Sequence, residues 1–146
     1  MIFIIRNTSR NYMKSKDRWV NSKTAVYNLA YHIIWCPKFR RKVLVNEVEK
    51  ELKRLLFLKA EELNCQIEAL EIMPDHVHLF IKTPPTIGVH FLVQQMKGVT
   101  ARELRKQFHS LKTRLPNMWT RSYYVESVGH ISEESIKRYV EEQKNK

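Results

Sequence analysis

Two apolar runs in the middle of the chain, joined by a two-residue connection, constrain its fold more than any other feature. They are "CQIEALEIM" at 65–73 and "HVHLFIK" at 76–82, with only Pro74 and Asp75 between them. Branched and apolar side chains favour strands, and a Pro-Asp connection is typical of a tight turn. A connection this short can join only antiparallel strands, so the sequence predicts a β-hairpin.

Helical patterns lie on either side of this hairpin. Residues 45–64, "VNEVEKELKRLLFLKAEELN", place apolar residues at intervals of three and four, which predicts an amphipathic helix. Residues 89–108 predict a second helix, with a bend at Gly98. Residues 132–143, "SEESIKRYVEEQ", predict a third, which begins at a suitable N-cap, Ser132.

The order of these elements predicts the fold class. Strand-like runs at 25–37 and 118–129 flank the helix–hairpin–helix unit, and 111–117, "LKTRLPN", predicts a loop. The order strand, helix, strand, strand, helix, strand, helix is that of the split βαβ arrangement. We therefore expect an α+β, ferredoxin-like (RRM-like) antiparallel sheet with helices on one face, followed by a C-terminal helix that carries a tyrosine.

Length and charge indicate one basic domain. The chain has 146 residues, enough for a single core, and residues 1–22 predict a basic N-terminal arm before a domain at 23–146. Arg6 interrupts the apolar start, and no stretch reaches a membrane-spanning length, so we expect a cytoplasmic protein with no membrane partner. A net charge of +11 in a chain that is 43% hydrophobic indicates a folded protein with a polyanion-binding face, and nucleic acid is the first candidate partner.

Two basic clusters are candidates for contacts with a DNA backbone, although either is also compatible with an ordinary solvated face. The candidates are Lys38, Arg40, Arg41 and Lys42 in the first cluster and Lys97, Arg102, Arg105 and Lys106 in the second. Trp35, Phe39 and Tyr123 have side chains that can stack on unpaired bases, although aromatic residues at strand spacing are more often core.

His76 and His78 are candidate metal ligands. On a strand they point to the same face, with Cα atoms about 6.6 Å apart, and two such imidazoles can bind one divalent ion. Asp75 either orients one of the rings or serves only the turn. The alternative is a pair of ordinary hydrogen-bonded histidines. Cys36 and Cys65 lie in apolar surroundings and suit a core better than a zinc site.

The C-terminal helix brings a second pair of polar residues to one face. Tyr139 and Gln143 lie four positions apart, which is one helical turn. An amide oxygen can bind Mg²⁺ or Mn²⁺, and a phenol can act as a nucleophile. The alternative is that Tyr139 packs beside Ile136 and Val140.

Together these motifs resemble the single-tyrosine HUH transposases of the insertion-sequence 200/605 group. The likeness extends from about Lys23 to Gln143 and is carried by "YHIIWCPKFRRKVL", "MPDHVHLFI", "MKGVTARELR" and "SVGHISEESIKRYVEEQ". The chain departs from the usual pattern in its N-terminal arm and at Gly129-His130, where a second small residue is common. Neither departure falls on the predicted site.

The resemblance implies a transposase that nicks and rejoins single-stranded ends of a mobile element, recognised through their hairpins, by way of a 5′-phosphotyrosine. It implies Tyr139 as the nucleophile and His76, His78 and Gln143 as ligands of Mg²⁺ or Mn²⁺. It also implies a homodimer, in which the partner subunit can supply the tyrosine helix. The rival functions are a non-enzymatic single-stranded nucleic-acid-binding module and a metal-dependent phosphoesterase that uses water instead of tyrosine.

Overall fold

The computed structural model describes residues 2–4, 20–21, 25–129 and 141–142. The strands are β1 (Ile2–Ile4), β2 (Val20–Asn21), β3 (Val26–Tyr27), β4 (Ala30–Trp35), β5 (Gln66–Met73), β6 (His76–Lys82) and β7 (Tyr124–Val128). The helices are a 3₁₀ turn, η1 (Lys38–Arg40), and α1 (Asn46–Glu62), α2 (Val89–Gln107) and α3 (His109–Arg114). The helix predicted at 132–143 lies outside the described residues except for 141–142, which are helical.

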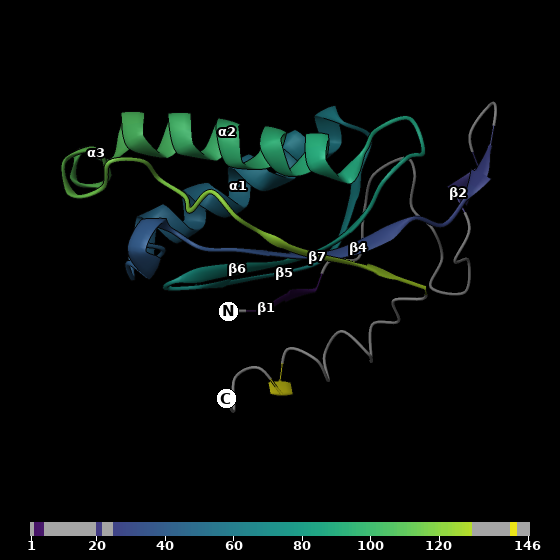
Figure 1. The fold of residues 1–146 in the computed structure, drawn as a ribbon, viewed down its shortest axis with the longest axis horizontal. Helices are drawn as coiled ribbons and strands as arrows, with labels where there is room; N and C mark the ends of the chain where they lie inside the picture. Colours follow the sequence, from purple (N-terminus) through teal and green to yellow (C-terminus); the bar gives the residue numbers. More distant parts are fainter. Residues whose placement is uncertain (1, 5–19, 22–24, 130–140, 143–146) are drawn as a thin grey trace.

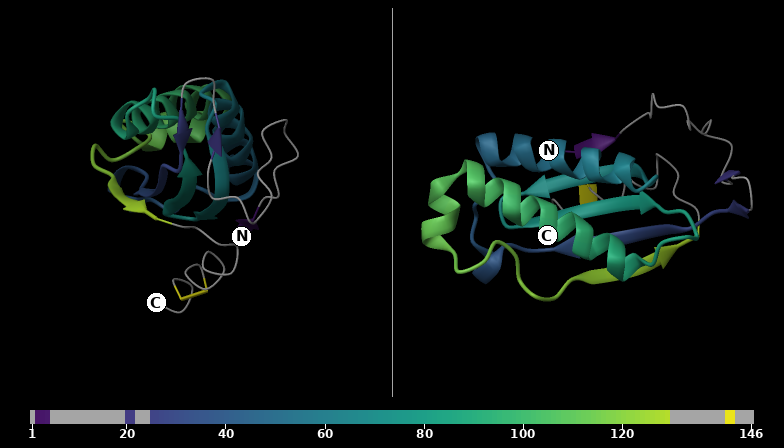
Figure 2. Two further views of the ribbon diagram at one scale, coloured as in Figure 1. Left: turned by 90° about the vertical axis from the view of Figure 1, so that its right-hand side faces the viewer. Right: turned by 90° about the horizontal axis from the view of Figure 1, so that it is seen from above.

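Five strands form one antiparallel sheet in the order β1-β5-β6-β4-β7. α1 and α2 cover the same face of this sheet (Figure 1), and the end-on view in Figure 2 shows the two layers. The sheet order β5-β6-β4-β7 and the crossovers through α1 and α2 are those of the predicted ferredoxin-like fold, which is confirmed. Within the described ranges, no helix is long and apolar enough to span a membrane.

The core lies between the sheet and the two long helices. From β4 and β6, Ile33, Trp35, Val77 and Leu79 are buried on the helix-covered face. They alternate with side chains that point to the face opposite α1 and α2, because successive residues of a strand face opposite sides. The helices contribute buried residues at intervals of three and four, among them Leu52, Leu55, Leu56, Leu92, Val93 and Met96.

The hairpin and the first two helices agree with the sequence predictions. β5 and β6 pair from Gln66↔Lys82 to Met73↔His76, so Pro74 and Asp75 form the predicted turn. α2 is one continuous helix through Gly98. The predicted strand at 25–37 is divided, because Val26–Tyr27 pairs with β2 while Ala30–Trp35 joins the main sheet.

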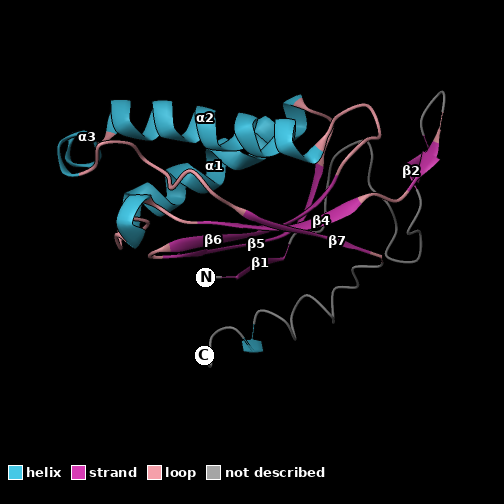
Figure 3. Cartoon of the chain, in the orientation of Figure 1, coloured by secondary structure: helices cyan, strands magenta, loops and turns pink. Residues whose placement is uncertain are grey.

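The secondary structure of two segments differs from the prediction (Figure 3). The burial of particular side chains explains both differences. Part of the predicted loop at 111–117 belongs to α3, which buries Leu111 against the core. Only Tyr124–Val128 of the predicted strand at 118–129 is a strand, because Met118 and Trp119 turn into the core instead.

Strand β1 shows that part of the predicted arm joins the sheet. Ile2, Phe3 and Ile4 pair with Glu71, Leu70 and Ala69 at the edge of β5. Because the pairing partners are more than sixty positions apart, no local pattern indicated it.

Trp119 depends on one buried hydrogen bond. Its indole N–H donates to Thr100 Oγ1 at 2.9 Å, and the Thr100 hydroxyl donates to the Met96 carbonyl oxygen at 2.7 Å. We expect Thr100→Val to lower the free energy of unfolding by about 1–3 kcal/mol, because the indole N–H loses its buried acceptor. Urea denaturation measures this. Thr113→Val, on the exposed face of α3, is the control and should change stability by less than about 0.5 kcal/mol.

Candidate metal centre

His76 and His78 lie on the face of β6 that points away from α1 and α2. Val77, between them, is buried on the opposite face. The two imidazoles are neighbours, with ring centroids 4.8 Å apart and planes at 76°. The alternation of the strand therefore brings both rings together, as the sequence indicated.

His76 is held by the turn residue before it. His76 Nδ1 lies 2.7 Å from Asp75 Oδ1, and Asp75 Oδ2 accepts a hydrogen bond from Arg40 at 3.1 Å. Burial alone would raise the pKa of Asp75, but its hydrogen bond with His76 and the nearby charges of His76 and Arg40 lower it. Asp75 thus belongs to the turn and also accepts a hydrogen bond from the Nδ1–H group of His76.

His78 is more deeply buried, with 4% of its surface exposed. Its Nδ1 lies 3.3 Å from Nε2 of His32, a β4 residue. Burial lowers the pKa of His78 to about 4, and the neighbouring His76 and His32 add to this effect. Burial also lowers the pKa of His32, although the hydrogen bond and charge of Glu126 oppose the shift. Both rings are therefore neutral at pH 7, and neutral imidazole is the form that binds metal ions.

The donor set suits a divalent ion. When Nδ1 of a neutral imidazole carries the proton, Nε2 carries the lone pair that a metal requires. Asp75 imposes this form on His76. Across residues 2–4, 20–21, 25–129 and 141–142, no group of three His, Cys, Asp or Glu side chains could hold a metal. A complete site needs another ligand, and the predicted ligand Gln143 lies outside the described residues, as does the predicted nucleophile Tyr139.

Three further polar residues lie on this face of the sheet, and the sequence analysis did not identify them as part of the site. His32 and Glu126 are cross-strand partners on β4 and β7. Glu71 is buried and lies opposite His78 in the β5–β6 register. His32 had a signal in sequence, since it interrupts the apolar run of β4 as His76 and His78 interrupt β6. The positions of both glutamates depend on strand register.

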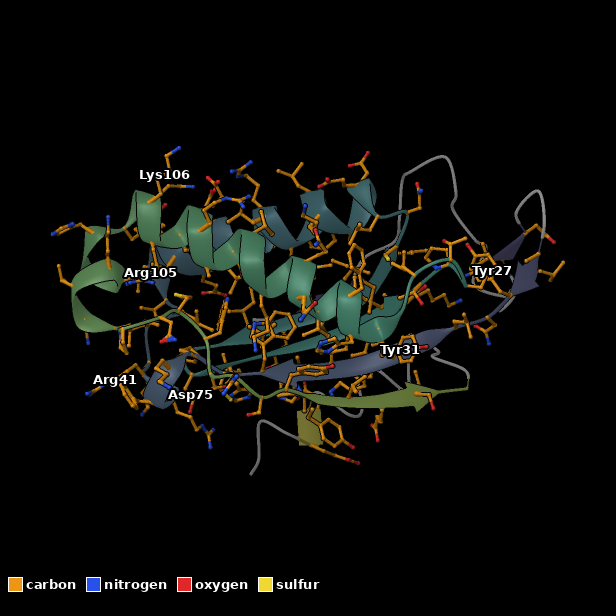
Figure 4. All side chains as sticks on the ribbon, turned by 45° about the horizontal axis from the view of Figure 1, so that its top comes forward. Tyr27, Tyr31, Arg41, Asp75, Arg105 and Lys106 are labelled. Carbon is orange, nitrogen blue, oxygen red and sulfur yellow. The ribbon has the colours of Figure 1, made fainter. Side chains whose placement is uncertain are left out.

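The first basic cluster adjoins the histidines. In η1 the backbone φ angles of Phe39 and Arg40 are 59° and 50°, which are left-handed values that non-glycine residues rarely adopt. This turn leaves the Phe39 side chain exposed (64%) and directs Arg40 toward Asp75. Figure 4 shows Arg41 and Asp75 at the same end of the molecule, far from Tyr27.

The second basic cluster lies on α2, on the side of the sheet opposite His76 and His78. Lys97 Nζ donates to the Thr120 carbonyl oxygen at 2.7 Å, and Arg105 Nη2 donates to that of Leu115 at 3.3 Å. Arg102 pairs with the adjacent Glu103, whereas Lys106 is exposed. Two of the four cations thus hold the segment between α3 and β7, and the DNA-contact role of this cluster stays a prediction.

The remaining candidates divide between core and surface. Trp35 is buried in the core, and Tyr123 is half-buried, with its hydroxyl 2.7 Å from His90 Nδ1. Of the three predicted stacking residues, only Phe39 is well exposed. Cys65 is buried, and burial raises the pKa of its thiol to about 12. Burial also raises the pKa of Cys36. Raised pKa values disfavour the thiolate that zinc requires.

Comparison with known proteins identifies the family. Residues 25–143 match the family described as "Transposase IS200 like". The chain is 37% identical over 123 residues to the ISDra2 transposase TnpA of Deinococcus radiodurans, covering 83% of this chain and 88% of that protein. It is 32% identical over 123 residues to the transposase for insertion sequence element IS200 of Salmonella typhimurium, covering 81% of each.

Solved structures agree in fold. A crystal structure of a candidate transposase from Deinococcus radiodurans R1 superposes with a TM-score of 0.69 at 36% identity, covering 84% of this chain and 96% of that one. A REP-associated tyrosine transposase bound to a REP hairpin gives a TM-score of 0.52 at 17% identity, covering 77% and 62%, which is a likeness of fold alone. The family match over most of the chain and the identity to curated transposases show that this protein belongs to the IS200-like transposase family.

Proposed function

We propose that this transposase nicks and rejoins single-stranded DNA at the ends of a mobile element through a covalent link to Tyr139. The observation that carries the proposal is the pair of β6 imidazoles, with ring centroids 4.8 Å apart and with Nδ1 of each ring in contact with another side chain. Two rings held in this way can present both Nε2 atoms to one divalent ion. Gln143 would add an amide oxygen from the C-terminal helix.

A bound Mg²⁺ or Mn²⁺ would supply positive charge at the scissile phosphate, which otherwise repels a nucleophile. His76 and His78 would each bind the ion through Nε2. Asp75 keeps His76 in its Nδ1-protonated form. Arg40 lies beside Asp75 and brings a permanent cation to this edge of the site. The Asp75 carboxylate thus holds the His76 ring, and the Arg40 guanidinium holds Asp75.

Tyr139 would carry out the chemistry. Its phenol oxygen forms a bond to phosphorus as the phenol proton is lost, the bond from phosphorus to the 3′ oxygen breaks, and the leaving 3′ oxygen takes up a proton. The products are a 5′-phosphotyrosine and a free 3′-hydroxyl. The link between Tyr139 and the 5′ phosphate is itself a phosphodiester, so a second 3′-hydroxyl can attack its phosphorus and displace Tyr139. Strand transfer therefore needs no ATP.

The proposed partners follow from the resemblance and from charge. The DNA would carry hairpins near the ends of the element, and the basic side chains beside η1 would contact its backbone. The protein would act as a homodimer, with the tyrosine helix of either subunit able to complete a site. Phe39, exposed beside these cations, is available to stack on an unpaired base.

The salt dependence of DNA binding tests the role of the η1 cluster. Changing Lys38, Arg41 and Lys42 together to Ala should reduce the slope of log K against log salt concentration by about 2, because each lost contact to a single strand removes about 0.7. Fluorescence anisotropy with a labelled single-stranded oligonucleotide measures the slope. The control replaces Lys50, Lys112 and Arg114, which are exposed on α1 and α3, and removes the same net charge. Equal slopes for the two variants would exclude a specific role for the cluster.

The proposed activity is tested by mixing the protein with Mn²⁺ and a single-stranded element end, then separating the mixture under denaturing conditions. A transposase of this kind becomes covalently attached to the DNA. A phosphoesterase would release cleaved DNA with no attached protein, and a simple binding module would leave the DNA intact.

A further inference from the structure

A line of hydrogen bonds crosses three neighbouring strands on the face of the sheet opposite α1 and α2. Glu126 Oε1 on β7 lies 3.2 Å from His32 Nδ1 on β4, and His32 Nε2 lies 3.3 Å from His78 Nδ1 on β6. The strand order β6-β4-β7 makes this arrangement possible, because it places β4 between the other two. Each of the two nitrogens of His32 therefore faces one neighbour in the line.

Packing fixes the His32 ring as well. Its face lies against the Phe80 ring, with centroids 4.4 Å apart and planes at 2°. His32 is 1% exposed, whereas the Glu126 side chain is 47% exposed and reaches solvent. The imidazole therefore has little freedom to tilt or flip, and its two nitrogens keep their assigned directions.

The donors and acceptors along the line can be assigned from Glu126. An ionised carboxylate only accepts hydrogen bonds, so His32 Nδ1 must donate to Glu126. A neutral His32 then has its lone pair on Nε2, where it can only accept. His78 Nδ1 must therefore be the donor in the contact between the two rings, and the lone pair of His78 lies on Nε2.

We infer that His32, oriented by Glu126, is a positioning residue that holds His78 in the Nδ1-protonated tautomer and so presents Nε2 of His78 as a metal ligand. This inference rests on the proposed metal site. Asp75 does the same for His76 through a direct carboxylate contact. β4 lies between β6 and β7, so His32 on β4 connects His78 to Glu126. His32 and Asp75 thus hold the two ligands, His78 and His76, in the same Nδ1-protonated tautomer.

The tautomer can be measured without metal or DNA. Long-range ¹H–¹⁵N spectra of histidine rings in the metal-free protein distinguish protonated from unprotonated nitrogens. We expect His78 to be protonated at Nδ1 in the wild type and to show an Nε2-protonated population in His32→Phe, which retains the stacking on Phe80 but offers no acceptor. His32→Gln supplies an amide oxygen near the position of Nε2 and should restore the wild-type tautomer.

Manganese binding gives the second measurement. Free Mn²⁺ followed by electron paramagnetic resonance should show affinity weakened about 10–100-fold in His32→Phe, the usual cost of losing a group that orients a ligand. His32→Gln should remain within about threefold of wild type. Glu126→Leu, a surface change on β7, should weaken binding about tenfold and tests the same line of contacts if His32→Phe does not fold. His90→Phe, a histidine on α2, is the control and should leave Mn²⁺ affinity unchanged.

The outcomes separate this inference from the proposed function. If His78→Ala loses Mn²⁺ while His32→Phe and Glu126→Leu keep wild-type affinity and tautomer, the metal site stands and the role of His32 is refuted. If the wild type binds no Mn²⁺, the proposed function fails, and the ring spectra still decide whether His32 sets the tautomer of His78. A purely structural role for His32 predicts that the Gln variant, which loses the stacking, is the more damaged of the two.

Discussion

Tyr139→Phe is expected to abolish the covalent protein–DNA adduct while leaving DNA affinity nearly unchanged. The substitution removes one oxygen, the proposed nucleophile, and preserves the aromatic ring. We expect the rate of adduct formation to fall by at least about 1,000-fold, because phenylalanine has no oxygen with which to form the ester. Denaturing electrophoresis measures the adduct, and anisotropy with the same oligonucleotide measures binding.

Tyr31→Phe is the matched control for this experiment. Tyr31 belongs to β4, and its side chain lies on the helix-covered face of the sheet, away from His76 and His78. Its conversion to Phe should leave adduct formation unchanged. Adduct formation by Tyr139→Phe at the wild-type rate would remove Tyr139 from the mechanism.

His78→Ala is expected to lose both the divalent ion and DNA cleavage. A two-histidine site that loses one imidazole retains a single nitrogen ligand, so Mn²⁺ affinity should fall by at least about 100-fold. Cleavage should fall with it, and a chelator should abolish cleavage by the wild type. Calorimetric titration with Mn²⁺ measures the affinity, and a thermal melt of each variant checks that the buried site still folds.

His90→Ala provides the comparison, since His90 is an exposed histidine on α2 whose ring contacts Tyr123. It should bind Mn²⁺ and cleave DNA as the wild type does. Full cleavage by His78→Ala, or by the wild type in excess chelator, would show that the reaction does not depend on a metal held by β6.

The segments predicted well from sequence carry their information locally. The predicted helix at 45–64 appears as Asn46–Glu62, because its apolar spacing of three and four is sufficient to define a buried face. The hairpin at 65–82 follows from two strand-like runs and a turn of two residues. The shared face of His76 and His78 follows from strand alternation alone.

The features that were missed depend on contacts between distant segments. Trp119 can be buried in the core because Thr100, nineteen positions earlier, accepts a hydrogen bond from its indole N–H. β1 forms because the edge of β5 is available to it. His32 meets His78 and Glu126 only through the register of three strands, and its burial gives it a role that its local sequence merely suggested. The pattern along one strand predicts which side chains share a face of the sheet. The register between strands decides which of those side chains touch.

Mapping the adduct by mass spectrometry tests the central claim most directly. After reaction with Mn²⁺ and a single-stranded element end, trypsin should release Tyr139 in the peptide "YVEEQK", and Tyr123 and Tyr124 together in "SYYVESVGHISEESIK". We predict a 5′-phosphonucleotide on Tyr139 and no modification when the ion is chelated. A nucleotide on Tyr124, whose ring lies 6.1 Å from that of His32, or an adduct that forms in chelator, would contradict the proposed site.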